Sequence, residues 1–575
     1  MDNFEIIIND IVVDFFKKNK ELLPDYKRLN ELLKNVSGIN NFFSSEEDVL
    51  ELENILFQGS KQEFQKGGRE FGDFQTNEDL ACKVYSYIAS KHSDFEFLLE
   101  PTCGKGNFIL ASLEGSNSFS RIVGVEIYKP YVWETKFKIL SYFLINDCVN
   151  LPEIDIIHGN VFEYSFSDLA NETKELKTLI IGNPPWVTNS ELGSIKSNNL
   201  PSKSNFKKLN GISAITGNGN FDIGEFITLH MLRSFQFHVG ILAFLIKNSV
   251  IKNLIYDQKT NNYSLGEMEK LNIDSKKEFN ASVDSSLFLT KLNSTPSFTC
   301  LERNLYDLKI KDTFGWYRDK FVNSIENYDK ANLIDGISEF EWRSGVKHDC
   351  SRVMEVDYKD NFLTNRLGEK IPIESDLIYG LLKSSDLKGE VINDCRKYTI
   401  ITQTKVGEQT DFIKEELPLT FKYLNSHLDV FNNRKSSIYK NKPPFSIFGI
   451  GDYSFKKYKV GISGLYKSTR FSLITPKKSR PLMLDDTCYF IGFDEKDQAE
   501  IALFLVNSDI VQEFLRSIIF LDSKRAINKN VLMRINFQKA FEYYSFDQAR
   551  IKIKDLSIES WNQFGFGLKQ EKECA

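Results

Sequence analysis

Short apolar runs that alternate with longer amphipathic stretches constrain the fold of this chain more than any other sequence feature. Runs of the length typical of buried strands lie at 95–100, 121–126, 153–160, 177–182, 239–246 and 286–292. Helical patterns separate most of them, as in "KPYVWETKFKILSYFLI" (129–145). Strands that alternate with helices indicate βαβ units, because parallel strands need a long crossover connection. The pattern therefore predicts an α/β protein built on a parallel sheet.

The composition argues against a membrane-spanning or disulfide-framed protein. Hydrophobic residues make up 41% and charged residues 26% of the chain, as in ordinary soluble proteins. It has no apolar run of about 18 residues, and acids interrupt the apolar start "MDNFEIIINDIVVDFFKKNK", which is unlike a signal peptide. None of the eight cysteines forms a CxxC pair. We therefore expect a cytoplasmic protein without a bound metal or a membrane partner.

The character of the sequence changes along the chain and predicts three parts. Residues 1–70 have apolar positions three and four apart and read as a helical segment. Residues 71–330 contain the alternating strands and helices. Residues 331–575 are rich in short apolar pieces, turns and aromatics, which favours a separate α+β domain. The polar run from Val187 to Asn220 is too long for an ordinary connection and predicts a lid over a ligand site.

One segment of the last part is strongly basic, although the whole chain carries a net charge of -6. Residues 431–480 contain 12 Lys and Arg residues and a single acid, Asp452, with nine Phe and Tyr residues interleaved. Such a segment is typical of a surface that binds a polyanion. A lysine-rich, solvated face of a sheet would give the same pattern.

A glycine-rich turn follows the first predicted strand in "LLEPTCGKGNFILASL" (98–113). Gly104 and Gly106 allow the backbone to approach a ligand closely, and a helix N-terminus follows them. The motif alone is weak, since many strand-to-helix turns contain Gly-x-Gly. Glu126 ends the next strand, 22 residues after Gly104. A carboxylate in that place can accept both hydroxyls of a ribose.

The stretch "TLIIGNPPW" (178–186) is the sharpest motif. Two prolines end the strand and forbid an immediate helix, so Asn183 and Trp186 lie on a stiff turn where ligands bind in open α/β sheets. Oxygens of Asn183 and Pro184 can hold both hydrogens of an exocyclic amino group, which frees the nitrogen lone pair for an electrophile. Trp186 can stack on a base. An Asn-Pro turn with a packing tryptophan is the simpler alternative, but a second proline, Pro185, speaks against it.

The segments "FGDFQTNEDLA", "LLEPTCGKGNF", "IVGVEIY", "HGNVF" and "LIIGNPPW", in this order, resemble the S-adenosylmethionine-dependent N6-adenine DNA methyltransferases of the gamma class. The resemblance covers residues 70–300 clearly and 340–535 more loosely. It implies a Rossmann-like methyltransferase sheet with helices on both faces and a C-terminal target-recognition domain. It also implies methyl transfer to N6 of an adenine flipped out of double-stranded DNA, in a restriction-modification or related defence system.

The resemblance also assigns roles to individual residues. Glu126 would accept the ribose hydroxyls, and Asn160 stands where the family usually has an Asp that faces the cofactor adenine. Phe279, in "EFNASVDSSLFL", would pack against the flipped base opposite Trp186. The implied cofactor-binding positions are Thr76, Glu100, Pro101, Cys103, Gly104, Gly106, Glu126, Asn160, Asp222 and Phe226. The implied catalytic positions are Asn183, Pro184, Pro185, Trp186 and Phe279.

Two C-terminal stretches resemble the target-recognition region of the same class, "EWRSGVKHD" (341–349) and residues 432–464. Basic side chains there would hold phosphates while loops read base edges in the major groove. The candidates for DNA contact are Lys347, Arg434, Lys435, Lys456, Lys457 and Lys459. Lys347 and His348 can equally well be structural.

Two other interpretations stay open. A methyltransferase acting on a protein glutamine amide or on RNA would use the same Asn-Pro-Pro chemistry, because an amide nitrogen has the same delocalised lone pair. A DNA-binding subunit with a decayed cofactor fold is the non-enzymatic alternative, against which the intact "NPPW" argues. We expect a monomer, and any restriction endonuclease to be a separate chain, because residues 1–70 are too short for a nuclease domain.

Overall fold

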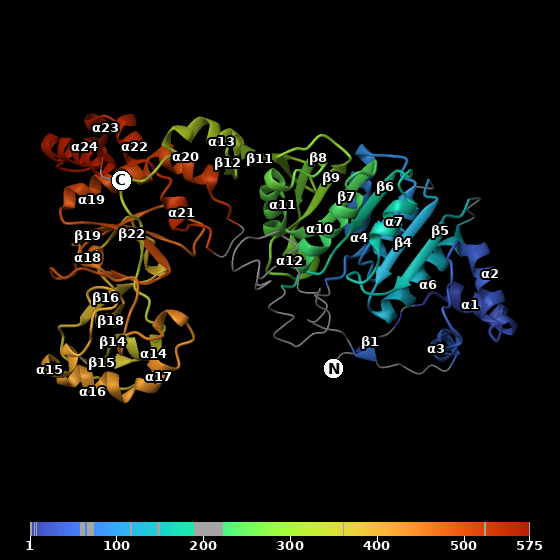
Figure 1. Cartoon of the computed structure of the whole chain (residues 1–575), viewed down its shortest axis with the longest axis horizontal. Coiled ribbons are helices and arrows are strands. Elements are labelled where there is room, and N and C mark those ends of the chain that lie inside the picture. The colour runs from blue at the N-terminus through green and yellow to red at the C-terminus, as the bar shows by residue number, and fades with distance from the viewer. Residues whose placement is uncertain are drawn as a thin grey trace. The chain divides into compact units, whose positions relative to one another are not determined.

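The computed structural model describes residues 3–4, 6, 8–57, 64–65, 74–115, 118–146, 150–188, 222–359, 362–521 and 525–573. The chain divides into two compact units, residues 1–321 and 322–575 (Figure 1). The polar run expected to form a lid falls almost entirely in 189–221, outside the described residues. Within the described ranges, no helix is both long and apolar enough to cross a membrane.

A ten-stranded sheet forms the centre of the first unit, with the order β12-β11-β10-β8-β9-β7-β6-β3-β4-β5. Neighbouring strands from β5 to β7 are parallel, as expected for βαβ units. The strands are β3 (Phe97–Glu100), β4 (Arg121–Glu126), β5 (Glu153–His158), β6 (Thr178–Gly182), β7 (Gly240–Lys247), β8 (Gly266–Asn272), β9 (Ser285–Leu292), β10 (Thr299–Asn304), β11 (Ile310–Tyr317) and β12 (Lys320–Val322).

The sheet also contains a strand that the βαβ pattern does not predict to be reversed, β9, which runs antiparallel to both β7 and β8. The connection from β8 to β9 contains only the five-residue helix α12, which is too short for a helical crossover, so the chain reverses instead. The sheet also continues beyond β8 through β10 and β11. The sequence analysis missed β8, β10 and β11 because charged residues interrupt their apolar positions.

Helices cover both faces of this sheet, which confirms the predicted doubly covered α/β class (Figure 1). α4, α5 and α6 pack on one face, and α7, α10 and α11 lie on the other. The helices of the first unit are α1 (Asp10–Lys18), α2 (Tyr26–Ser37), α3 (Glu46–Phe57), α4 (Glu78–Lys91), α5 (Asn107–Gly115), α6 (Lys129–Ile145), α7 (Phe166–Glu172), α10 (Ile223–Phe235), α11 (Asn248–Asn261) and α12 (Ser275–Phe279).

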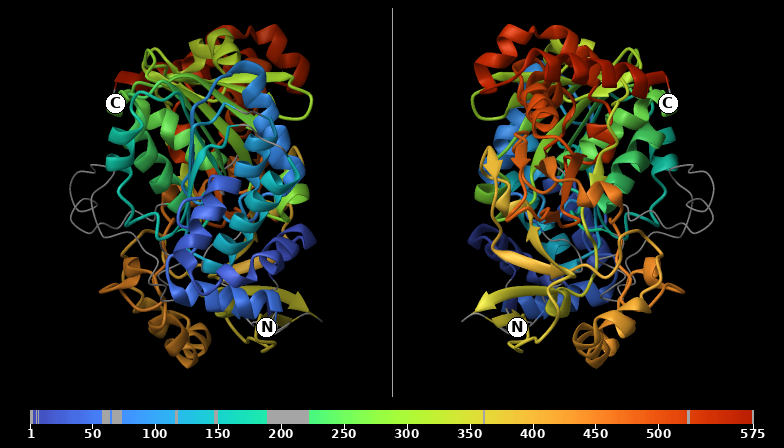
Figure 2. Two further views of the ribbon diagram at one scale, coloured as in Figure 1. Left: turned by 90° about the vertical axis from the view of Figure 1, so that its right-hand side faces the viewer. Right: turned by 90° about the vertical axis from the view of Figure 1, so that its left-hand side faces the viewer.

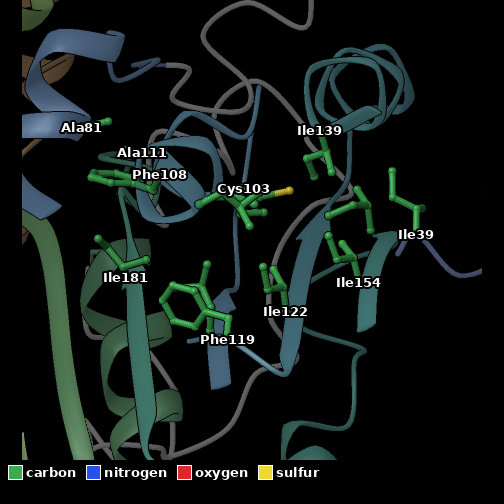
Figure 3. Close-up of a cluster of buried hydrophobic side chains, with 14 of the residues drawn as sticks. Ile39, Ala81, Cys103, Phe108, Ala111, Phe119, Ile122, Ile139, Ile154 and Ile181 are labelled. Carbon is green, nitrogen blue, oxygen red and sulfur yellow. The ribbon is translucent and has the colours of Figure 1, made fainter. Parts of the chain in front are cut away.

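The N-terminal helices share the core of the sheet. α1 and α2 pack against α6. These dark-blue helices are seen most clearly in the left view of Figure 2. Phe16 and Phe42 belong to the same buried cluster as Leu98 and Ile122 of the central strands. Figure 3 shows part of this cluster, where Ile39 lies near Ile154. The N-terminal helices therefore extend the hydrophobic core on this face of the sheet. A short pair, β1 (Asn3–Phe4) and β2 (Phe64–Gln65), completes the described elements of this unit.

The second unit contains two five-stranded sheets and a set of C-terminal helices, in agreement with the expected α+β class. One sheet has the order β13-β22-β19-β20-β17 and the other β15-β14-β18-β16-β21. The strands are β13 (Arg343–Ser344), β14 (Glu355–Lys359), β15 (Phe362–Asn365), β16 (Ile378–Leu382), β17 (Val391–Ile392), β18 (Lys397–Ile400), β19 (Tyr458–Ser463), β20 (Ser472–Ile474), β21 (Met483–Leu484) and β22 (Cys488–Phe493).

Helices of the second unit pack mainly near its C-terminal end, where α19 contacts α20, α22 and α24. They are α13 (Ile325–Ala331), α14 (Ser351–Met354), α15 (Phe412–Glu416), α16 (Pro418–Ser426), α17 (Leu428–Asn432), α18 (Asp452–Phe455), α19 (Lys496–Asn507), α20 (Asp509–Ile518), α21 (Lys529–Leu532), α22 (Phe537–Tyr543), α23 (Phe546–Lys552) and α24 (Ile558–Glu573).

Candidate active site

The order of the sheet fixes where a ligand can bind. β3 pairs with β4 on one side and with β6 on the other, so the direction of winding reverses between β3 and β6. In open α/β sheets ligands bind beyond the carboxyl ends of the strands at such a switch point. The glycine-rich turn follows β3 and the Asn-Pro-Pro-Trp corner follows β6. The fold therefore brings the two predicted motifs to one place.

The turn after β3 needs both of its glycines. Gly104 has φ +51° and Gly106 has φ +71°, in the left-handed region. A Cβ on Gly106 would lie 2.6 Å from Thr135 Cγ2, and one on Gly104 would lie 2.6 Å from Gln75 Oε1. The Thr135 hydroxyl donates to the Gly104 carbonyl at 3.0 Å. The backbone of this turn is therefore packed tightly against Thr135 and Gln75.

Glu126 lies at the end of β4, where its carboxylate meets the turn. One oxygen accepts from the Gly104 amide at 2.8 Å and the other from the Tyr128 amide at 2.7 Å. The two amides fix the plane of a side chain that is only 8% exposed. A carboxylate has about four lone-pair sites, and these two amides fill one on each oxygen.

Glu100 and Thr102 carry buried oxygens without a hydrogen-bond partner among the described residues, Glu100 Oε2 and Thr102 Oγ1. Burial, with the Glu126 carboxylate nearby, raises the pKa of Glu100 well above its usual range. Buried polar atoms are normally satisfied. Unsatisfied atoms beside a glycine turn indicate that a polar ligand completes this site. Cys103 contributes only its main chain, because its thiol points into the apolar cluster (Figure 3).

The amide of Asn183 is held in one orientation. Nδ2 donates to the Phe74 carbonyl at 2.7 Å and to Thr76 Oγ1 at 3.2 Å. A carbonyl only accepts, so the nitrogen must face Phe74 and Oδ1 must face the other way. Oδ1 is buried and has no partner among the described residues. The corner therefore presents a fixed, unused acceptor.

Thr76 links this corner to the glycine turn. Its hydroxyl accepts from Asn183, and its carbonyl accepts from Asn107 Nδ2, at the start of α5, at 2.7 Å. Gln75 accepts from the Lys105 amide at 3.2 Å. Residues 74–76 therefore span the distance between the two motifs.

The aromatic residues of the corner touch one another. The Trp186 ring centroid lies 5.0 Å from that of Phe74 and 4.9 Å from that of Phe279, with a 74° angle to Phe279. Trp186 Nε1 donates to the Leu245 carbonyl at 3.2 Å, and the side chain is 5% exposed. A base between two rings needs about 7 Å, twice the carbon contact distance. As placed, Phe279 lies edge-on to Trp186 and Phe74 lies against it, so the rings leave no space for a base between them.

The remaining cofactor candidates lie around the start of α10 and the end of β5. Asp222 caps α10 through the Gly224 amide at 2.9 Å and pairs with Lys247 Nζ at 2.6 Å. Burial raises its pKa, although Lys247 partly offsets the effect. Phe226 packs edge-on against Phe162, with centroids 5.5 Å apart. Asn160 Oδ1 accepts from the Phe162 amide at 3.0 Å.

Three residues of this region were missed from the sequence. Phe74 and Phe162 lie inside quoted motifs, but nothing in the sequence shows which ring packs on which. Lys247 ends β7, and only the fold brings it to Asp222. The first residues of "FGDFQTNEDLA", up to residue 73, lie outside the described residues. Among the described residues, no group of three or more His, Cys, Asp or Glu side chains could hold a metal.

The structure corrects two of the six DNA-contact candidates in the second unit. Lys459 is fully buried in β19, donates to the Lys456 carbonyl at 2.8 Å, and burial lowers its pKa to about 7. Arg434 donates to the Ser446 carbonyl at 2.6 Å and stacks on Tyr439, which makes it a structural side chain. As placed, Lys459 cannot reach a phosphate, and the half-buried guanidinium of Arg434 is engaged by main-chain carbonyls.

The other four lysines reach solvent to different degrees. Lys435 and Lys457 are exposed. Lys456 is ion-paired with Asp494 and Lys347 with Asp349, the latter at 3.7 Å. Exposed ion pairs of this kind are weak and exchange easily. These lysines therefore remain candidates for phosphate contact.

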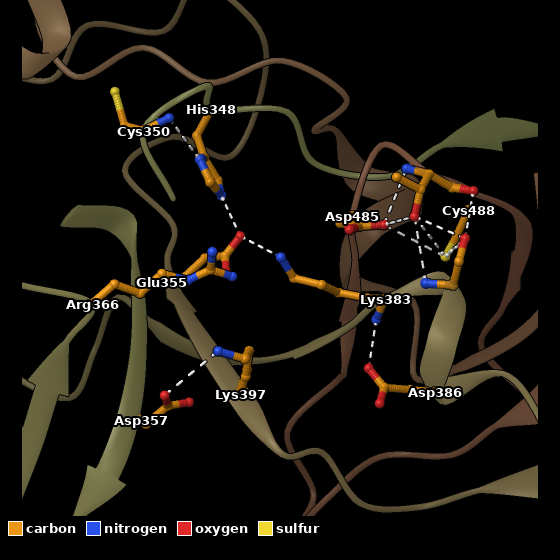
Figure 4. A network of polar contacts seen from close by, with 12 residues as sticks. His348, Cys350, Glu355, Asp357, Arg366, Lys383, Asp386, Lys397, Asp485 and Cys488 are labelled. Atoms are coloured by element: carbon orange, nitrogen blue, oxygen red, sulfur yellow. Dashed lines mark hydrogen bonds and ion pairs between the residues drawn. The ribbon is translucent and has the colours of Figure 1, made fainter. Parts of the chain in front are cut away.

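His348 is structural, as Figure 4 shows. Its Nδ1 accepts from the Cys350 amide at 3.1 Å, and Nε2 lies 3.8 Å from Glu355. Glu355 also pairs with Arg366 and with Lys383 Nζ at 2.6 Å. Burial lowers the pKa of His348 to about 4, so the ring stays neutral at neutral pH. This buried network braces the second unit.

Fold and site together define an α/β protein of the methyltransferase class. The type II methyltransferase M.NspV from Nostoc sp. is 38% identical to the chain over 481 residues, which cover 82% of this chain and 96% of that relative. The chain therefore belongs to the type II methyltransferases and is a methyltransferase of the restriction-modification type. No protein-family model matches the sequence.

Solved structures show weaker likeness. The type IIL restriction-modification enzyme MmeI, in complex with DNA, has a TM-score of 0.48 and 13% identity, over 92% of this chain and 75% of that one. The type IIG restriction endonuclease BpuSI has a TM-score of 0.35 and 13% identity, over 91% and 68%. The family assignment rests on the sequence relative alone.

Proposed function

We propose that this chain is a site-specific DNA methyltransferase that transfers a methyl group from S-adenosylmethionine to N6 of an adenine flipped out of the duplex. The observation that carries the proposal is the fixed Oδ1 of Asn183 beside the glycine turn, which has no hydrogen-bond partner among the described residues. Membership of the type II methyltransferases supports the reaction class.

The residues around the switch point fit the cofactor. Glu126 would accept the ribose hydroxyls, since its carboxylate is already oriented by two amides. Glu100 Oε2 and Thr102 Oγ1 would find partners in the polar methionine part. The cofactor-binding site would be completed by Asp222, Phe226 and Asn160. Bound S-adenosylmethionine would supply an electrophilic methyl group on a sulfonium.

The corner would act by holding the amine. Asn183 Oδ1 would accept one amino hydrogen and the Pro184 carbonyl the other. Two acceptors on one nitrogen favour a tetrahedral geometry, in which the lone pair leaves conjugation with the ring. Removing one such preorganised partner typically lowers kcat by about 10²–10³. Pro184 and Pro185 keep both acceptors fixed before the base arrives.

The aromatic residues would receive the base. Extrusion of a base from a duplex costs a few kcal/mol, and stacking on an aromatic ring returns about 1–3 kcal/mol. Phe279 is partly exposed and stands edge-on to Trp186. We infer that this ring turns when the base enters, so that the base stacks where the two rings now touch.

The second unit would bind the DNA. Lys347, Lys435, Lys456 and Lys457 would hold phosphates on double-stranded DNA, and loops of this unit would select the sequence. The basic composition of residues 431–480 supports this role. A protein amide as substrate would leave that basic segment without a polyanion to bind. A cognate endonuclease would be a separate chain.

Transfer of labelled methyl groups tests the proposal. The protein is incubated with tritiated S-adenosylmethionine and, in parallel, with unmethylated plasmid DNA, RNA or a protein extract. Incorporation into the plasmid alone is expected. Incorporation into RNA or protein, with none into DNA, would contradict the proposal. The Asn183→Ala variant is the control for methyl incorporation that does not depend on the Asn-Pro-Pro-Trp corner.

A further inference from the structure

The position of Phe279 depends on a helix too short to be stable by itself. α12 has five residues, Ser275–Phe279, and Phe279 is its last one. The hydroxyl of Tyr306 contacts both ends of this helix. It accepts from the Asp274 amide, at the N-cap, at 3.3 Å, and donates to Glu278 Oε1, beside Phe279, at 2.7 Å. One side chain thus bridges the two ends of the helix.

The second oxygen of Glu278 reaches the other wall of the site. Oε2 accepts from Asn77 Nδ2 at 3.1 Å. Asn77 caps α4 through the Leu80 amide at 2.8 Å and directly follows Thr76, which orients the catalytic amide. The path Tyr306–Glu278–Asn77, here called the clasp, therefore joins the segment that orients Asn183 to the helix that carries Phe279.

We propose that the clasp residues Tyr306, Glu278 and Asn77 are positioning residues of methyl transfer. Their task is to keep α12 and residues 74–77 at a fixed separation while Phe279 turns about its own side-chain bonds to admit the base. The inference rests on the proposed function, because it assigns the clasp to that reaction. None of the three side chains needs to touch the substrate.

The charge state of the clasp suits this task. Burial, together with the Glu278 carboxylate, raises the pKa of Tyr306 to about 12, so its hydroxyl stays a donor. Burial opposes ionisation of Glu278, but the hydrogen bonds from Tyr306 and Asn77 outweigh it and lower the pKa. The ionised Glu278 carboxylate accepts from Tyr306 and Asn77, and hydrogen bonds to a charged acceptor are stronger than those between neutral groups.

The clasp also gives a function to the outer part of the sheet. Tyr306 stands in the turn after β10, where its amide donates to Asn304 Oδ1 at 2.8 Å. β10 is parallel to β8, so its carboxyl end lies at the same edge as the end of β8, from which α12 begins. Because the sheet extends beyond β8 to β10, Tyr306 lies beside α12, the helix that carries Phe279.

Steady-state kinetics of variants of the full chain test the inference. Tyr306→Phe removes one hydroxyl, Glu278→Ala breaks both arms of the clasp, and Glu278→Gln keeps an acceptor for Asn77. The matched control is Tyr263→Phe, whose hydroxyl accepts from Arg233 Nε at 3.2 Å. Tyr263 precedes β8 and so lies at the opposite edge of the sheet. Methylation of unmethylated plasmid DNA, S-adenosylmethionine affinity by calorimetry and melting temperature are measured for each.

We expect Tyr306→Phe to lower kcat about fivefold to twentyfold, the effect of one charge-assisted hydrogen bond, with KM for DNA and cofactor affinity within about twofold. Glu278→Ala should lose more, and Glu278→Gln should recover part. Tyr263→Phe should keep the wild-type kcat. Equal kcat for Tyr306→Phe and wild type, or a loss that only follows the melting temperature in both tyrosine variants, would overturn the inference. A wild-type protein inactive on DNA would overturn the proposed function as well.

Discussion

The side-chain amide of Asn183 is oriented through its nitrogen, which donates to Phe74 and Thr76, while its oxygen has no partner in the part of the chain that the structure describes. The sequence identifies the amide but not what turns it. The orienting groups lie more than 100 residues upstream, and only the fold brings them to the corner. At the residue scale, hydrogen bonds within the protein decide which atom of the amide is left to contact a ligand.

Replacing Asn183 with Ala should abolish methylation while S-adenosylmethionine still binds. The variant removes the acceptor of the amino hydrogen, so kcat should fall by at least about 10²-fold. The cofactor residues of the glycine turn are untouched. Methyl transfer to plasmid DNA and calorimetric titration with S-adenosylmethionine measure the two effects. Loss of cofactor binding would mean that Asn183 binds the cofactor and does not hold the amine of the substrate.

Lys457 and Lys459 form a matched pair, because one is exposed and the other fully buried in the same strand region. Lys457→Ala should weaken duplex binding severalfold by removing a phosphate contact. Lys459→Met should leave DNA affinity within about twofold. Fluorescence anisotropy with a labelled duplex measures both. A loss of DNA affinity in Lys459→Met without loss of folding would reinstate it as a contact.

The buried ammonium of Lys459 also makes stability depend on pH. Its pKa is lowered from its ordinary value to about 7, so between about pH 7 and 10 the unfolded state binds more protons than the folded state. Stability from this group therefore rises with pH across that window. Lys459→Met should flatten this part of the melting-temperature profile and raise stability near pH 7.

Among the elements, the strand-to-helix turns decide the site. The sequence predicts six strands at their observed places, because each stands as a short apolar stretch bounded by turns or helical patterns. It misses β8, β10 and β11, in which charged residues pair across strands, as Lys270 and Glu302 do at 3.5 Å. It also cannot show that Trp186 and Phe279 are in contact, because ring packing depends on tertiary distances. Motif positions were thus predictable, and side-chain orientations were not.

Gly106→Ala should weaken S-adenosylmethionine binding at least about tenfold. The new Cβ would require a left-handed backbone and would lie 2.6 Å from Thr135 Cγ2, which displaces the turn. Gly407→Ala is the control, since Gly407 has φ +83° with nothing within 4 Å of the added atom. Calorimetric titration of both variants separates steric displacement from backbone strain alone. Equal cofactor affinity in Gly106→Ala and wild type would show that the turn does not hold the ligand.

For the whole molecule, the two compact units suggest a division of labour. The first unit holds every described candidate for cofactor binding and catalysis, and the second holds the basic segment. The sequence predicts the change in character after residue 330, and the chain passes from the first compact unit to the second after residue 321. We propose that catalysis belongs to the first unit and target recognition to the second.

DNA affinity should fall steeply with salt if the second unit holds phosphates. Each phosphate neutralised by a lysine or arginine releases condensed counterions, so the logarithm of affinity falls linearly with that of salt concentration. Four contacts give a slope of roughly −3 to −4. Anisotropy titrations from 50 to 300 mM KCl measure it. A slope near zero would contradict the assignment of the basic segment.

Modified-base sequencing of DNA from cells that express this chain tests the central claim most directly. The claim is that Asn183 and Pro184, after β6, hold the amino group of an adenine by hydrogen bonds during methyl transfer. The account predicts N6-methyladenine at one recurring sequence in cells with the wild-type protein, and none in cells with Asn183→Ala. Methylation of another base, or the same adenine pattern with both proteins, would contradict it.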